Sequence, residues 1–419
     1  MRVLWICNMI LPAIAKVKNL SYSEREGWLS GIYEQVMKEK QLPIQLGIAY
    51  PGSGDGIEKT ILDRCTGYAF PEDIAAPEVY DIALEEHLAW IISDYKPDMI
   101  HVFGTEFPHA LAAVRAFGRP DKTLIGIQGL CYLIAKVYTK DIPDYVVNRK
   151  TFRDAIKRDS ILAQKEKFRL RGEYEKEAIR LARHITGRTE FDKEGALRLN
   201  QDARYHFMNE TMRSCFYEGK WQEENCRKHS IFLSQGDYPI KGLHYVLQVL
   251  PKLREKYPDV HLYVAGNSIV ANRTAKDRLK LSSYGKYLLQ LIRKNHLKKC
   301  VTILGKLDAG QMKEQFMQSH VFVCPSIIEN SPNALAEAML LGVPVVAAAT
   351  GGIPSMLEDG KEGILYPPGD MAGLMWGIIR AFEVGKVFSD QERERAAKAH
   401  DGESNYQTLL SVYREIVKE

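Results

Sequence analysis

The sequence predicts an α/β protein in which parallel sheets are built in two domains. Short apolar runs alternate with longer amphipathic patterns along the chain, as expected for consecutive βαβ units. The alternation is interrupted once, by the polar segment Phe216–Lys228, which predicts an interdomain linker. A chain of 419 residues is also long enough for two or three domains with separate cores.

The apolar runs place the strands in order. The predicted strands are Val3–Cys7, Ile44–Ile48, Met99–Phe103, Leu124–Ile127 and His184–Thr186, followed by Ser230–Leu233, Val260–Ala265, Val301–Leu304, Val321–Val323 and Pro344–Ala347. Helical patterns separate them: Ile82, Leu84, His87, Leu88, Ile91 and Ile92, for example, recur at spacings typical of one helix face. A last helix is predicted over Ser404–Lys418.

The composition is that of an ordinary soluble globular protein, with 26% charged and 45% hydrophobic residues. A net charge of +4 over this length gives no indication of nucleic-acid binding. The seven cysteines are scattered and form no C-x-x-C pair, which argues against a disulfide framework or a zinc site. We therefore expect a cytoplasmic protein, and no apolar run approaches the ~20 residues of a membrane-spanning helix.

The most informative pair of residues is Glu329 and Glu337. Glu329 falls in a short loop after an apolar run, and Glu337 falls on the helix that follows. Ser331 is the expected N-cap of that helix, with Pro332 at its first position. The free N–H groups of a helix N-terminus suit a diphosphate or sugar hydroxyls, so the layout predicts a nucleotide-sugar site.

Three further segments follow this pair in order: Gly342–Ala347 (GVPVVA), Gly351–Pro354 (GGIP) and Gly363–Asp370 (GILYPPGD). Together the four motifs resemble the Glu-x7-Glu signature region of retaining GT-B glycosyltransferases, the group 1 or family 4 type. The resemblance implies two Rossmann-like domains facing a central cleft. The acceptor domain is then expected over 1–215, with a C-terminal helix at about 400–419 packing back onto it, and the nucleotide-sugar domain over 229–399.

The resemblance also assigns roles on the donor side. Glu329 and Lys241 map onto the catalytic positions, near the transferred sugar and the diphosphate, and Glu337 onto the glutamate that binds the ribose hydroxyls. The other donor-binding positions that it implies are Asn330, Ser331 and Asn333 around the sugar, Gly305, Lys306 and Leu307 around the nucleobase, and Gly27 in a glycine-containing turn.

The sequence departs from the family pattern at two donor positions. Gly236 stands where the family has the second cation of its diphosphate clamp, and Arg273 is a candidate replacement. The usual G-F-G after the first glutamate is replaced by Asn330-Ser331-Pro332-Asn333, which leaves the sugar open.

The acceptor side is expected in the first half, around Glu106, His109 and Gln128. Gln128 occupies a position where many relatives have a histidine, and a glutamine cannot act as a general base. Glu106 and His109 are therefore the nearest titratable alternatives. His101 lies within a predicted strand and is expected to point into the sheet.

The block Asn209–Arg213, followed by Phe216 and Tyr217, resembles a bacterial subset of these enzymes that act in capsule or exopolysaccharide pathways. The acceptor is then a glycan or a lipid-linked glycan. Residues 149–183 carry twelve Lys or Arg against six Asp or Glu, interleaved with apolar residues. This pattern is typical of a helix at the inner face of an anionic membrane, or of a solvated helix with ion pairs.

The function predicted from the sequence is a retaining hexosyltransferase with a UDP- or GDP-linked donor. No metal is expected, because no Asp-x-Asp occurs in the chain. One alternative is an inactive GT-B protein that binds a nucleotide-sugar, since the departures at Gly236 and Gln128 could reflect lost activity. The other is a nicotinamide-dependent oxidoreductase, although no G-x-G-x-x-G follows the first strand.

Overall fold

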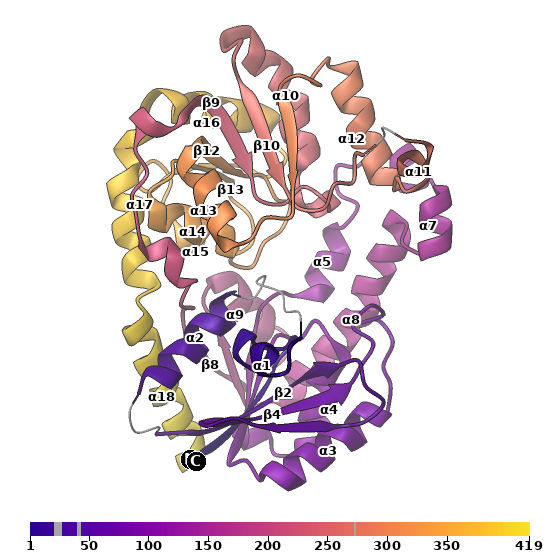
Figure 1. Ribbon diagram of the computed structural model, residues 1–419, viewed down its shortest axis with the longest axis vertical. Helices are drawn as coiled ribbons and strands as arrows, with labels where there is room; N and C mark the ends of the chain where they lie inside the picture. The colour runs from indigo at the N-terminus through magenta and orange to yellow at the C-terminus, as the bar shows by residue number, and fades with distance from the viewer. Residues whose placement is uncertain (21–26, 40–42, 272–273) are drawn as a thin grey trace. The chain divides into compact units, whose positions relative to one another are not determined.

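The computed structural model describes residues 1–20, 27–39, 43–271 and 274–419, and the chain divides into two compact units. Unit 1 comprises Met1–Ala135, Lys167–Arg213 and His400–Glu419, and unit 2 comprises Lys136–Glu166 and Ser214–Ala399 (Figure 1). The C-terminal residues thus group with unit 1. Residues 136–166 group with unit 2, although the sequence places them in the range expected for the first domain.

Unit 1 contains an eight-stranded sheet with the order β3-β4-β2-β1-β5-β6-β7-β8. Its pairings are parallel, except that β3 runs antiparallel to β4. The strands are β1 (Arg2–Ile6), β2 (Gln45–Gly52), β3 (Glu58–Ile61), β4 (Cys65–Pro71), β5 (Met99–Phe103), β6 (Thr123–Gly126), β7 (His184–Gly187) and β8 (Arg204–Phe207).

Unit 2 contains a six-stranded parallel sheet with the order β11-β10-β9-β12-β13-β14. The strands are β9 (Arg227–Leu233), β10 (His261–Ala265), β11 (Val301–Gly305), β12 (Ser319–Cys324), β13 (Val345–Ala348) and β14 (Ile364–Tyr366). The α/β prediction with two parallel sheets is confirmed. The sequence did not predict β3, β4, β8 or β14.

The helices lie between the strands, as βαβ units require. In unit 1 they are α1 (Pro12–Val17), α2 (Gly27–Lys38), α3 (Ala83–Tyr95), α4 (Pro108–Phe117), α9 (Glu190–Leu197) and α18 (Gly402–Lys418), and α5 (Cys131–Val137) crosses from unit 1 into unit 2 at Lys136. In unit 2 they are α6 (Asp144–Val147), α7 (Phe152–Lys157), α10 (Leu243–Lys256), α11 (Ala275–Leu279), α12 (Ser283–Lys294), α13 (Ala309–Gln318), α14 (Asn333–Leu341), α15 (Ile353–Met356), α16 (Met371–Val384) and α17 (Lys386–Ala399). Helix α8 (Ile161–Leu181) runs across the boundary at Lys167. Among the described residues, no helix is long and apolar enough to cross a membrane.

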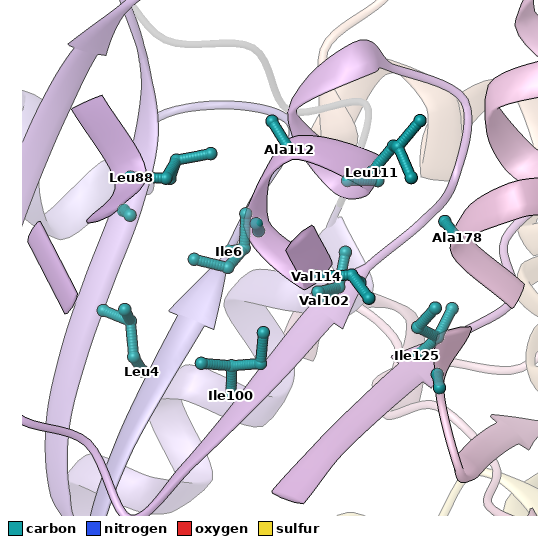
Figure 2. Packing of buried hydrophobic residues seen from close by; sticks show 14 of the residues in the cluster. Leu4, Ile6, Leu88, Ile100, Val102, Leu111, Ala112, Val114, Ile125 and Ala178 are labelled. Carbon is teal, nitrogen blue, oxygen red and sulfur yellow. The ribbon is translucent and has the colours of Figure 1, made fainter. Parts of the chain in front are cut away.

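One face of the unit 1 sheet packs against α3, α4 and α8 to form a continuous hydrophobic core (Figure 2). Figure 2 shows strand residues such as Ile6 and Val102 pointing toward Leu88 of α3 and Val114 of α4. These side chains are almost fully buried, and burying each contributes about 1.5–3 kcal/mol. The core therefore fixes the sheet on which the candidate acceptor residues lie.

The last helix, α18, is attached to this sheet by a buried polar contact. The Tyr413 hydroxyl accepts a hydrogen bond from Trp5 Nε1 (2.8 Å) and lies 2.7 Å from His101 Nδ1. All three side chains are fully buried, and burial lowers the pKa of His101 to about 3. A neutral imidazole can accept the Tyr413 proton, so His101 has the structural role expected of a residue pointing into the sheet.

The segment 216–228, where the sequence predicts a linker, packs closely on unit 2. Phe216 and Trp221 are buried, and Trp221 donates from its indole to Ser319 O (2.8 Å). Its backbone N–H also bonds Leu341 O (2.8 Å). Most residues of the segment are polar and face outward, so its composition is that of a linker. The two aromatic residues that attach it to unit 2 are too few to change that composition.

Replacing Tyr413 by Phe should destabilise the protein, because it leaves the Trp5 N–H and the His101 nitrogen buried without their partner. We expect the free energy of unfolding to fall by about 1–3 kcal/mol, seen as a lower midpoint in calorimetry. Tyr406→Phe is the matched control on the same helix, since the buried Tyr406 hydroxyl has no hydrogen-bond partner in the part of the chain that the structure describes. That change should be neutral or stabilising. Equal losses in the two variants would contradict the proposed anchor.

Candidate active site

Each sheet reverses its strand order at one point, and this reversal locates the site. In unit 2 the chain proceeds outward from β9 to β11 in one direction and from β12 to β14 in the other. In open α/β sheets, ligands bind at the carboxyl ends of the strands on either side of such a switch point. The loops that follow β9 and β12 carry Lys241 and Glu329. In unit 1 the switch point lies between β1 and β5, followed by Asn8 and Glu106.

Lys241 and Glu329 are in direct contact. Lys241 Nζ donates to Glu329 Oε1 at 2.6 Å, and the same oxygen accepts a hydrogen bond from Ser326 Oγ at 2.7 Å. Burial opposes the charged ammonium, but the Glu329 carboxylate and its hydrogen bond raise the pKa of Lys241 above its ordinary value. Lys241 is therefore held as a cation at the switch point.

The Lys241 and Glu329 loops are held together by their backbones. Ile327 N donates to Ile240 O (2.8 Å), which joins the loop after β12 to the loop after β9. Gly242 has φ +74°, and a Cβ atom there would lie 2.0 Å from Pro325 O. Only glycine fits this position, because any side chain would separate the two loops.

A third loop fixes Glu329 from the other side. Gly352 N donates to Glu329 O (3.0 Å), and Thr350 Oγ1 donates to Ile327 O (2.7 Å). Gly351 has φ +55°, and a Cβ atom there would lie 1.8 Å from Glu329 O. The two glycines of the GGIP segment thus allow the chain after β13 to close on the backbone of Glu329.

Helix α14 carries Glu337 and begins beside Glu329. The predicted N-cap, Ser331, is displaced by one residue: Pro332 is the N-cap and makes no side-chain capping bond, and Asn333 is the first helical residue. Glu337 is buried at 4% exposure, as are Asn330 and Ser331 at 8% each. A nine-residue helix without a side-chain cap offers backbone N–H groups at this end.

The position where the resemblance expects an arginine is closed by packing. A Cβ atom on Gly236 would lie 2.6 Å from Val264 Cγ1 and 2.7 Å from Leu243 Cδ2. The next residue, Asp237, accepts from the side chain of Asn267 (2.6 Å) and so ties the end of β9 to the end of β10. The proposed replacement, Arg273, lies outside the described residues.

Gly305, Lys306 and Leu307 lie at the same carboxyl edge as Lys241. Gly305 ends β11, the strand next to β10, and accepts a hydrogen bond from Gly266 N (3.0 Å). Gly305 has φ +84°, and no heavy atom lies within 4 Å of an added Cβ. A glycine is therefore needed here for the backbone conformation of the turn and not for close packing. The Lys306 side chain is exposed.

Gly27 begins α2 in unit 1, and its close neighbour is an arginine side chain. A Cβ atom on Gly27 would lie 2.2 Å from Arg213 Cγ, and one on Gly31 would lie 2.6 Å from Thr211 O. The two glycines, one helical turn apart, let the segment around Thr211 lie against α2. In the described structure, the aliphatic part of the Arg213 side chain therefore lies directly against Gly27, the position that the resemblance assigns to donor binding.

A hydrogen-bonded chain joins the expected acceptor residues of unit 1. His109 Nδ1 lies 2.6 Å from Glu72 Oε2, and His109 Nε2 lies 3.0 Å from Asn8 Oδ1. Both nitrogens of this buried ring are therefore engaged by partners within unit 1, so neither is directed at an acceptor hydroxyl. Glu106 lies next to Asn8, and burial raises the pKa of its carboxyl. Of the two predicted titratable alternatives, the geometry favours Glu106.

Gln128 has a structural partner on each side of its amide. Gln128 Nε2 donates to Glu210 Oε1 (2.8 Å), and Arg188 Nη2 donates to Gln128 Oε1 (3.4 Å). Arg188 also pairs directly with Glu210. Burial raises the pKa of Glu210, while Arg188 and Gln128 favour its charged form. Gln128 thus completes a buried ion pair next to the Glu106 loop.

Sequence reasoning missed Ser326, Asn8 and Glu72. Each lies within two residues of the carboxyl end of an observed strand, which is the one signal that could have identified them. Their roles depend on contacts between loops distant in sequence. Glu72 follows β4, a strand the sequence did not predict, so it could not be placed.

Elsewhere in unit 1, three side chains lie close enough together to hold a metal ion. His184, His206 and Glu415 each offer a ligand atom within 4.8 Å of the others, the one such group among the described residues. Arg204 already contacts Glu415 at 2.8 Å. His184 is the first residue of β7, so the cluster does not lie at the carboxyl-end loops that carry the candidate site.

Residues 219–400 match the protein family Glycosyl transferases group 1. Among curated proteins, the chain is similar to spore coat protein SA of Bacillus subtilis (strain 168), with 30% identity over 195 residues. This stretch covers 42% of the chain and 45% of that protein, so the chain spans less than half the length of this relative.

Two solved structures are similar over nearly the whole chain. Sucrose-phosphate synthase from Thermosynechococcus elongatus has a TM-score of 0.71 at 15% identity and covers 99% of both chains. Anabaena HepE, in complex with UDP and glucose, has a TM-score of 0.65 at 16% identity and covers 99% of this chain and 100% of its own. The two Rossmann-like parallel sheets therefore form the GT-B fold.

Gly351→Ala should disrupt the Glu329 loop, because the added methyl overlaps the Glu329 carbonyl. Gly360→Ala is the matched control, since Gly360 has φ +74° with no atom within 4 Å of an added Cβ. The control should lose only about 1–2 kcal/mol of unfolding free energy, from its left-handed conformation. Gly351→Ala should lose clearly more in a denaturant titration. Similar losses would contradict the close packing described around Glu329.

Proposed function

We propose that the protein is a retaining glycosyltransferase that moves a sugar from a nucleotide-sugar to a glycan. The observation that carries this proposal is the contact of Lys241 with Glu329 at the switch point of unit 2, beside the uncapped N-terminus of α14. A cation and free N–H groups suit a diphosphate, and carboxylates suit sugar hydroxyls. The match of residues 219–400 to Glycosyl transferases group 1 supports this assignment.

In this proposal the donor is a UDP- or GDP-linked sugar bound to unit 2. Glu337 accepts hydrogen bonds from the ribose hydroxyls, and Gly305–Leu307 frames the base. Asn330, Ser331 and Asn333 hold the transferred sugar. The UDP complex of the structurally similar HepE favours UDP over GDP.

The proposed chemistry is a front-face transfer without a protein nucleophile. The bond from the sugar to the diphosphate breaks as the acceptor oxygen attacks the same face, and the departing diphosphate takes the acceptor proton. Lys241 and the N–H groups of α14 stabilise the charge that develops on the diphosphate, the kind of electrostatic contribution that often dominates catalysis. Glu329 positions both the sugar and the Lys241 ammonium. No metal takes part in this scheme.

On the acceptor side, we assign Glu106 as the titratable group at the unit 1 switch point and Gln128 as its neighbour. His109 holds Asn8 and Glu72 in place. The Asn209–Arg213 block favours a role in bacterial capsule or exopolysaccharide synthesis, with a glycan or lipid-linked acceptor. The seven cysteines are thiols in the described structure, which supports a location in the reducing cytoplasm.

Peripheral membrane contact, expected over 149–183, is best supported at α7. Phe152 and Ile156 lie one turn apart and are 61% and 64% exposed, next to the exposed Lys157 and Arg158. Asp154 on the opposite side is buried and accepts from Ser283 N (2.9 Å), which fixes α7 on unit 2. From Lys167 onward, by contrast, α8 packs into unit 1 and buries Glu175.

The donor assignment predicts nucleotide binding that depends on Glu337. In a thermal-shift panel of UDP, GDP, ADP, CMP, their common sugars and NAD, UDP or GDP compounds should raise the melting temperature. The shift should be weaker in Glu337→Ala, because the ribose loses its acceptor, and equal in EDTA and in Mn²⁺. Glu394→Ala, an exposed glutamate on α17 outside the site, is the control.

The other outcomes separate the alternatives. A shift with NAD alone would favour the oxidoreductase. Nucleotide-sugar binding without turnover of any glycan acceptor would favour the inactive binding protein. A shift that requires Mn²⁺ would overturn the metal-independent scheme.

The membrane assignment predicts that the double change Phe152→Ser and Ile156→Ser weakens binding to vesicles rich in phosphatidylglycerol. Sedimentation should show a loss of at least about tenfold, since each apolar side chain contributes about 1.5–3 kcal/mol when buried. Trp376→Ser with Val387→Ser removes two equally exposed side chains of unit 2 elsewhere and should leave binding unchanged. If the two double variants bind equally, α7 is not the contact.

A further inference from the structure

A groove of about 740 Å³ opens on unit 1, beside the carboxyl ends of β2 and β4. Tyr50 and the glycine-containing stretch 52–56 form one side, and residues 71–74 form another. Ile10 and Leu20 complete it. Ligand sites commonly have volumes of about 300–1,000 Å³, so the groove could hold several sugar rings.

Tyr50 lines this groove, and its buried hydroxyl has no partner among the described residues. Tyr50 is 1% exposed, and its hydroxyl makes no hydrogen bond within the described structure. Burial, together with the nearby Glu58, raises the pKa of Tyr50 to about 12, so the group remains a donor at neutral pH. An unpaired buried hydroxyl is costly, by about 1–3 kcal/mol, unless a ligand oxygen accepts from it.

The charges in the groove exclude one class of ligand. Three carboxylates, from Glu58, Glu72 and Asp73, face a single lysine, Lys18. Lys18 is already paired with Glu58, and Glu72 is bonded to His109. Asp73 is exposed, and among the described residues its carboxylate accepts a backbone N–H from Ala75 (3.0 Å). A phosphate or carboxylate ligand would meet uncompensated negative charge, whereas sugar hydroxyls would find acceptors.

Apolar side chains provide the remaining surface. Ile74 is 55% exposed and Leu20 is 50% exposed, and both line the groove together with Ile10. Exposed apolar side chains gathered in a groove beside a few polar groups are typical of a ligand site. The C–H faces of sugar rings suit such a surface, because each ring presents apolar faces with hydroxyls at its edges.

We propose that this groove binds the uncharged saccharide part of the acceptor. The Tyr50 hydroxyl donates to a sugar oxygen, and the Asp73 carboxylate accepts from sugar hydroxyls. Ile74 and Leu20 contact the ring faces. The identification of the ligand as the acceptor rests on the proposed transferase function, whereas the saccharide class rests on the groove itself.

The groove is connected to the acceptor residues at the switch point. Glu72 lines the groove and is bonded to His109, which is in turn bonded to Asn8 beside Glu106. The chain of side chains fixes the orientation of the groove wall relative to Glu106. A saccharide in the groove would thus be held by residues coupled to the proposed acceptor site.

Direct binding tests the saccharide class without any assumption about catalysis. The labelled full-length protein is applied to a glycan array that displays neutral, phosphorylated and uronic-acid glycans. We expect signals from neutral glycans that fall at least about tenfold in Tyr50→Phe and in Ile74→Ser. Tyr406→Phe, which removes a buried unpartnered hydroxyl away from the groove, should bind as the wild type does. Signals confined to anionic glycans, or none, would overturn the proposal.

A charge reversal tests the selectivity of the groove. Asp73→Lys should admit phosphorylated or uronic-acid glycans that the wild type rejects, whereas Asp202→Lys, at an exposed position of unit 1 outside the groove, should not. Unchanged selectivity in Asp73→Lys would contradict the charge argument.

Kinetics and nucleotide binding separate this proposal from the transferase assignment. In turnover with a neutral glycan from the array, Tyr50→Phe should raise the acceptor KM about tenfold and leave the donor KM unchanged. A protein that binds neutral glycans but no nucleotide would refute the transferase function while retaining the saccharide groove. A protein that binds nucleotide-sugars but no neutral glycan would refute the saccharide groove while retaining the transferase function.

Discussion

The reversal of strand order between β9 and β12 is the constraint on which the candidate donor site depends. In a parallel sheet all carboxyl ends lie at one edge, and at a reversal the loops lead away from each other and leave space between them. Here that space is narrow, because Gly242 lies against Pro325 O and Gly351 against Glu329 O. The ion pair of Lys241 with Glu329 is a consequence of this backbone packing. Unit 1 has the same reversal between β1 and β5.

The candidate donor site has little positive charge for a ligand that carries a diphosphate. Lys241 is the one lysine or arginine in residues 234–242 and 325–333, and Glu329 already neutralises it in the described structure. Val264 and Leu243 close the space at Gly236 in which an arginine could stand. Backbone N–H groups of α14 would therefore have to compensate more of the diphosphate charge than in a site with two cations. Their fixed orientation makes this contribution insensitive to protonation.

Much of the fold could be predicted from the sequence, because buried parallel strands are continuous apolar runs between helical patterns. The strands that were missed lack this property. β3 is an exposed antiparallel edge strand, β14 is only three residues long, and β4 contains Gly67. The Lys241 and Glu329 pair was identified through motif spacing. Other contacts could not be identified in this way. Ser326, the Glu72–His109–Asn8 chain and the Trp221 anchor depend on contacts between segments that are distant in sequence.

The attachment of α18 to the first strand has a consequence for how the protein is made. Trp5 and Tyr413 are 408 positions apart, and α18 can pack on the unit 1 sheet only after the whole of unit 2 has been made. At about 5–20 residues per second, the ribosome exposes β1 roughly 20–80 s before Tyr413 emerges. All residues of unit 2 have been synthesised at Ala399, so this unit can fold during synthesis. Unit 1 cannot complete its fold until α18 has been synthesised, and part of its apolar sheet remains uncovered until then. The nascent chain is then a substrate for chaperones through unit 1, and a premature stop near the C-terminus would leave the first domain unfinished.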